Sequence, residues 1–105
     1  MADAADYIED VKRYDADADT AIVQKIVNHL GIALKSTDAS LVSCSDKSEK
    51  DRVRDGFCKK KLGMDEATAG AAVDAVCEQM KASKRKSRVT FYYLLAKNAG
   101  KLGDL

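Results

Sequence analysis

The chain contains no proline in its 105 residues. Proline interrupts helices more strongly than any other residue, because its ring removes a backbone donor and clashes with the preceding turn. Average usage of about 5% would place several prolines in a chain of this length. With 46% apolar and 33% charged residues, the composition is that of a globular protein. We therefore expect a compact all-α fold, and the length fits a single domain over residues 1–105 with one core.

Apolar residues recur at helical spacing in five segments, which predicts a five-helix domain. The predicted helices cover residues 4–14, about 18–35, about 46–62, about 66–80 and 88–99. Gly31 interrupts the second pattern, but apolar residues continue beyond it, so we expect that helix to run to about Lys35. The segment 36–45 between the second and third helices is rich in turn residues and is predicted to be irregular.

Capping residues mark the ends of these helices. The candidate N-caps are Asp17 or Asp19 for the second helix, Ser45 for the third, Asp65 for the fourth and Ser87 for the last. Ser45 is favoured because Ser48 or Glu49 would reach back in an arrangement like a capping box. Gly63 suits a left-handed position after the third helix, and Gly100 stops the last one.

The segment 89–96, VTFYYLLA, is the ambiguous one, because β-branched and aromatic residues also favour strands. The other segments supply no strand partner, so we predict a helix. Its apolar residues cover nearly every direction, and a helix that is apolar all round is buried. Such a helix either lies at the centre of the domain or is shared with a second protomer, and we expect a homodimer.

The first residues are acidic and lack the basic and apolar regions of a secretory signal. No window approaches the roughly 18 apolar residues of a membrane span. We therefore expect a cytoplasmic protein that does not contact a membrane. Three cysteines, an odd number, do not suggest a disulfide framework, so reduced thiols are expected.

The cysteines and the single histidine do not form a metal-site pattern. Cys44, Cys58 and Cys77 lack the short spacings of structural zinc sites, and His29 lies at the edge of a helical stripe. We expect no metal, no cofactor and no catalytic residue. Cys44 is the candidate reactive thiol, for a redox or nucleophilic role, because it would lie near the free amides of a helix start. Cys77 is predicted to be a small core residue.

A basic run lies between the last two predicted helices, in the segment 81–88. Its cations are Lys81, Lys84, Arg85, Lys86 and Arg88. Such a run can contact phosphates or an acidic partner. The net charge is only +1 and no aromatic residue is interleaved with the cations, which argues against nucleic acid as the partner. A solvated connector is the simpler interpretation.

Several long strings carry a resemblance to a known family. These are DASLVSCSDKSEKDRVRDGFCKKKLG and VCEQMKASKRKSRVTFYYLLAK, preceded by YIEDVKRY and IVNHLGIALKS. With them the chain resembles, from about Asp6 to Leu102, the small bacterial family catalogued as domain of unknown function 2853. The resemblance implies a compact all-α bacterial protein, and it implies no activity, substrate or cofactor. Members of the family tend to carry an aliphatic residue at the position of Cys58, which argues against a shared catalytic or metal role there.

The sequence thus favours a small, non-enzymatic interaction or structural module of the bacterial cytoplasm. Binding of nucleic acid or an acidic partner through residues 81–88 is the alternative. A thiol-based role of Cys44 is the third hypothesis.

Overall fold

The structure is a computed structural model of the chain, and it describes residues 4–31, 41–83 and 86–102. The elements are a short 3-10 helix η1 (Ala4–Asp6), α1 (Ile8–Lys12), α2 (Thr20–Leu30), α3 (Lys47–Val53), a π-helix η3 (Arg54–Lys61), α4 (Glu66–Gln79) and α5 (Arg88–Asn98). One isolated antiparallel bridge, between Leu41 and Ser87, accompanies the helices in the described part. The all-α prediction is confirmed, and the ambiguous segment 89–96 is helical.

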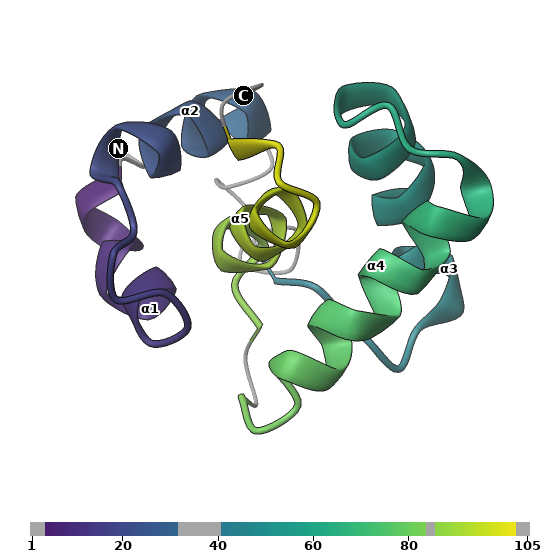
Figure 1. Cartoon of the computed structure of the whole chain (residues 1–105). Helices are drawn as coiled ribbons and strands as arrows, with labels where there is room; N and C mark the ends of the chain where they lie inside the picture. Colours follow the sequence, from purple (N-terminus) through teal and green to yellow (C-terminus); the bar gives the residue numbers. More distant parts are fainter. Residues whose placement is uncertain (1–3, 32–40, 84–85, 103–105) are drawn as a thin grey trace.

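Helix α5 lies at the centre of the molecule (Figure 1). The helices η1, α1 and α2 lie on one side of it, and α3, η3 and α4 lie on the other. Every residue from Val89 to Ala96 is buried. The apolar pattern around this helix therefore reflects a central position within one chain. The surface on which we based the homodimer is covered by the chain's own helices, so dimerisation stays a prediction.

The N-terminal helices are shorter than predicted. The predicted helix over 4–14 is divided into η1 and α1. The next helix starts at Thr20, where the Asp19 side chain accepts a hydrogen bond from the amide of Ala21 at 2.8 Å. Helix α2 ends at Leu30, because its C-cap Gly31 has a positive φ of 47° that no α-helix accommodates, and the predicted stretch up to about Lys35 lies outside the described residues. Residues 32–40, including most of the predicted connector, lie outside the described residues.

The third helix begins at a different cap from the predicted one. Asp46, and not Ser45, is the N-cap of α3, and its carboxylate accepts from the amides of Ser48 at 2.9 Å and Glu49 at 3.4 Å. A carboxylate one residue closer to the helix reaches these amides directly, whereas the Ser45 hydroxyl lies 3.3 Å from that of Ser43.

The third helix widens into the π-helix η3 at Arg54. In a π-helix the hydrogen bonds span five residues, which changes the spacing of the buried positions. Within this π-helix Phe57 and Cys58 are both buried. Gly63 follows with a φ of 68°, as predicted.

Helix α4 starts as predicted, with the Asp65 carboxylate accepting from the amide of Thr68 at 2.7 Å. It buries Ala69, Val73 and Val76 toward the core. Ser87 occupies the N-cap position of α5, but its hydroxyl makes no capping bond. Among residues 4–31, 41–83 and 86–102, no helix is both long enough and apolar enough to cross a membrane.

Candidate functional site

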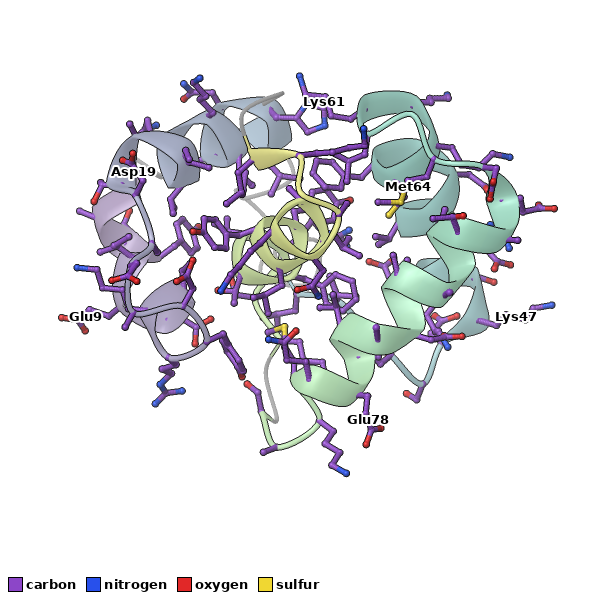
Figure 2. All side chains as sticks on the ribbon, viewed as in Figure 1. Glu9, Asp19, Lys47, Lys61, Met64 and Glu78 are labelled. Carbon is purple, nitrogen blue, oxygen red and sulfur yellow. A yellow bond between two sulfur atoms is a disulfide. The ribbon has the colours of Figure 1, made fainter. Side chains whose placement is uncertain are left out.

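Of the cations in the predicted basic segment 81–88, Lys81, Lys86 and Arg88 are described, and each of them has a partner within the chain. Lys81 donates to the Glu78 carboxylate at 2.8 Å, at the end of α4 where Figure 2 labels Glu78. Lys86 donates to the carbonyl of Ser83 at 2.9 Å. Lys84 and Arg85 lie outside the described residues. Two of the predicted contact residues are thus engaged with their own neighbours in the chain.

Arg88, the last cation of that run, is part of the fold. Its guanidinium donates to the carboxylate of Glu49, to the carbonyl of Leu41 at 3.2 Å and to the hydroxyl of Tyr92 at 3.2 Å. Only 11% of the Arg88 side chain and 13% of the Glu49 side chain are exposed. Burial alone would lower the pKa of Arg88, but the hydrogen bonds with Tyr92 and Glu49 outweigh burial and raise it. The Arg88 side chain thus connects α5 to α3.

Cys44 and Cys77 are joined by a disulfide, with their Cα atoms 5.8 Å apart. The expectation of reduced thiols is therefore wrong for these two cysteines. Their separation of 33 residues contains no pairing signal, and only the packing of the segment before α3 against α4 brings them together. Cys77 is half-buried at the edge of the core and is not fully enclosed in it. As one half of a disulfide, Cys44 has no thiolate with which to act as a nucleophile.

The third cysteine, Cys58, is completely buried. Burial raises the pKa of its thiol to about 11, so the thiol stays protonated and unreactive at neutral pH.

The ring of His29 lies 5.7 Å from that of Phe57, and burial together with the positive charge of Lys61 lowers the pKa of His29. Both causes favour the neutral imidazole over the charged one. Among the described residues, no group of three or more His, Cys, Asp or Glu is placed to hold a metal ion.

A groove of about 190 Å³ lies between α4 and the helix formed by α3 and η3. Its walls are formed by Lys47, Lys50, Asp51, Arg54, Gly70, Val73 and Asp74. Lys50 forms an ion pair with Asp74 at 2.6 Å, and Arg54 forms one with Asp51 at 3.2 Å. Lys47 is exposed at the outer edge of α3 (Figure 2), and no partner for its ammonium is found in the described part of the chain. The groove thus presents one unpaired cation beside two internal ion pairs.

Because Gly70 has no side chain, it leaves space on the side of the groove that α4 forms. A Cβ atom at this position would lie 3.9 Å from Cδ of Arg54, an ordinary contact distance. The backbone of α4 would accept a side chain here, because the φ of Gly70 is not positive. The glycine therefore leaves space in the groove without being required by the helix.

Sequence reasoning did not identify this groove. The signal that points to it is the placement of Lys47, Lys50 and Arg54 three and four residues apart, on one side of a helix. That spacing indicates a shared helix face. It does not indicate that Gly70 and Val73 of α4 lie opposite.

Residues 6–103 match the family described as "Protein of unknown function (DUF2853)". The match covers nearly the whole chain, and the chain belongs to this family. A comparison with curated proteins finds no match. The family resemblance inferred from the sequence is thus confirmed.

Proposed function

We propose that the chain is a small non-enzymatic interaction module of the bacterial cytoplasm, and that the groove between α3 and α4 binds an acidic side chain of a partner protein. The observation that carries this proposal is the groove itself, with Lys47 unpaired at its rim among the described residues. Val73 and the small Gly70 form an apolar floor beside that cation. A carboxylate on a short apolar stem matches such a surface.

The size of the groove supports docking of a side chain. Pockets for small-molecule ligands usually enclose about 300–1,000 Å³. At about 190 Å³ this groove is smaller. A side chain that belongs to a larger partner needs only part of that volume, because the rest of the partner contacts the surrounding surface.

The charges of the groove support an acidic group. Asp74 and Asp51 are each within ion-pair distance of a cation in the groove. Lys47 supplies the remaining positive charge, and it lies on the first turn of α3. An incoming carboxylate therefore gains an ion pair at Lys47 without displacing the existing pairs.

A titration with a defined acidic probe tests this proposal. Hexaglutamate added to isotope-labelled protein at low salt should shift the amide signals of residues 47–54 and 70–74. Lys47→Glu should abolish these shifts, whereas Lys25→Glu, which reverses an exposed charge on α2, should leave them unchanged. Shifts that persist in Lys47→Glu would contradict the proposal. Equal or stronger shifts with a single-stranded oligonucleotide of the same charge would favour the nucleic-acid alternative instead.

Self-association is part of the same proposal, although α5 cannot supply its surface. Light scattering measures the mass directly. A mass near 11.4 kDa at high protein concentration would refute a homodimer. If one copy of the chain occupies the groove of another with its own carboxylates, hexaglutamate should displace it and lower the mass. The mass should therefore be recorded with and without hexaglutamate.

A further inference from the structure

The disulfide between Cys44 and Cys77 joins an irregular segment to a helix. Cys44 lies in the segment 43–46, immediately before α3, and Cys77 lies near the end of α4. The other hydrogen bonds found for this segment are local, such as the amide of Asp46 to the carbonyl of Ser43 at 3.4 Å. Within the described part of the chain, the disulfide is thus the bond that ties the segment to α4.

The chain on both sides of this segment is held by other contacts. Before it, the amide of Val42 donates to the carbonyl of Lys86 at 2.8 Å, and the Val42 side chain is buried. After it, Glu49 is paired with Arg88. Neither contact involves a sulfur atom. Cleavage of the disulfide would therefore free about one turn of chain between two points that remain attached.

The two sulfurs also form an isolated pair. Cys44 and Cys77 are both half-buried, which leaves this pair closer to solvent than the third cysteine. Cys58, by contrast, is completely buried within η3 and keeps its proton. Exchange between thiols requires a thiolate and access, and Cys58 offers neither in the folded state. A change of redox state is thereby confined to one pair.

We propose that Cys44 and Cys77 are a reversible redox pair, reduced by a dithiol, whose reduced form keeps the fold and releases the segment 43–46 from α4. In a reducing compartment such as the cytoplasm, a disulfide of this kind is transient and responds to the thiol pool. This inference does not depend on the groove, because its readout lies in the connector before α3.

The chemistry balances with a dithiol reductant. Its thiolate attacks one sulfur of the pair, the Cys44–Cys77 bond breaks, and the other sulfur leaves as a thiolate that takes a proton from water. The second thiol of the reductant then attacks the mixed disulfide and releases the remaining cysteine as a thiol. Two electrons pass to the protein, and the reductant ends as its own disulfide.

Native-state hydrogen exchange with and without dithiothreitol tests the proposal. Reduction without denaturant should expose two thiols to alkylation and leave Cys58 unmodified. The amides of residues 45–49 should then exchange faster by at least about tenfold, because local opening no longer requires the disulfide to break. The amide of Val42 should change by less than about twofold, because its bond to Lys86 is independent of the sulfurs.

Variants distinguish a reversible redox pair from a permanent structural disulfide. Cys44→Ser with Cys77→Ser should reproduce the exchange pattern of the reduced protein and retain its circular dichroism spectrum. Cys58→Ala, or Cys58→Val if alanine leaves a damaging cavity, should leave the reduction equilibrium unchanged. Reduction that occurs only in denaturant would overturn the proposal. So would loss of protection throughout α5, or unchanged exchange at residues 45–49.

Discussion

Arg88 of α5 and Glu49 of α3, 39 residues apart, form a nearly buried ion pair on one side of the central helix. On the other side of α5, Thr90 donates to the carboxylate of Asp10 and Tyr93 donates to that of Asp15. The central helix is therefore bound to both of its neighbouring layers by polar side chains as well as by apolar packing. These contacts give the buried polar groups partners and fix how each layer sits on α5.

Removing one member of the Arg88–Glu49 pair should destabilise the fold strongly. Arg88→Met leaves the Glu49 carboxylate nearly buried, so we expect the free energy of unfolding to fall by about 3 kcal/mol. Arg52→Met is the matched control, because Arg52 lies 3.9 Å from the same carboxylate but is 79% exposed, and it should cost less than about 0.5 kcal/mol. Urea unfolding measures both values. Similar losses in the two variants would show that burial does not set the strength of this pair.

The identity of the α3 cap gives a second prediction. Asp46→Ala should lower the free energy of unfolding by about 1 kcal/mol, because the amides of Ser48 and Glu49 lose their acceptor. Ser45→Ala should have little effect, since the Ser45 hydroxyl does not cap the helix. Urea unfolding of the two variants in parallel checks this. A larger loss in Ser45→Ala would restore the cap that the sequence pattern suggested.

The wrong prediction of Ser45 as the N-cap of α3 shows what a local sequence pattern does not determine. Fold class, the burial of residues 89–96 and the Asp65 cap depend on local pattern, and each was predictable, but the pattern left open whether the last helix is covered within one chain or by a second protomer. A choice between adjacent capping residues such as Ser45 and Asp46 depends on the path of the backbone, which periodicity does not specify. The end of α2 was likewise missed, because the apolar pattern continues past Gly31 while the backbone turns.

The candidate site was less predictable than the fold. Cys44 and Cys77 are 33 residues apart, and only tertiary packing makes them partners. The groove depends in the same way on the contact between α3 and α4. Arg88 belongs to a basic run in the sequence, but its burial depends on Glu49, which the sequence places in another helix.

The groove also yields a prediction that separates stability from binding. Gly70→Ala should raise the free energy of unfolding by up to about 1 kcal/mol, because glycine inside a helix is less favourable than alanine and the space beside Arg54 admits a methyl group. The same methyl group narrows the groove, so hexaglutamate binding should weaken. Gly56→Ala, in η3 with open space around it, is the control that should leave binding unchanged. Unaltered binding in Gly70→Ala would place the acidic probe elsewhere.

Reduction of the disulfide should lower stability without unfolding the protein. Closing a loop of 33 residues restricts the unfolded chain, which corresponds to about 4 kcal/mol in the chain-entropy treatment. Domains of this size are usually stable by about 5–15 kcal/mol, so the reduced form should remain folded. Urea unfolding with and without dithiothreitol measures the difference, and Cys58→Ala should show the same difference. A loss below about 1 kcal/mol would mean that the unfolded chain is not restricted by this link.

The contact between Tyr93 and Asp15 should make stability depend on acid pH. The Tyr93 hydroxyl donates to the Asp15 carboxylate at 2.7 Å, with Lys97 3.5 Å away on the other oxygen. The hydrogen bond from Tyr93 is the largest of the causes that lower the pKa of Asp15 below its ordinary value of 3.8. Because the pKa is lower in the folded state, the stabilisation is fully present above about pH 4 and is lost as the pH falls through the folded value.

Substitution of Tyr93 by phenylalanine tests that assignment. In Tyr93→Phe the pKa of Asp15 should move back toward its ordinary value, so the loss of stability between pH 4 and pH 2 should be smaller than in the unmodified protein. Urea midpoints measured at intervals of half a pH unit give the two slopes. Tyr14 is a half-buried tyrosine whose hydroxyl has no hydrogen bond in the described part of the chain, so Tyr14→Phe should leave the acid slope unchanged. Identical slopes in Tyr93→Phe and the unmodified protein would assign the acid sensitivity to other carboxylates, of which Asp65 at the start of α4 also has a lowered pKa.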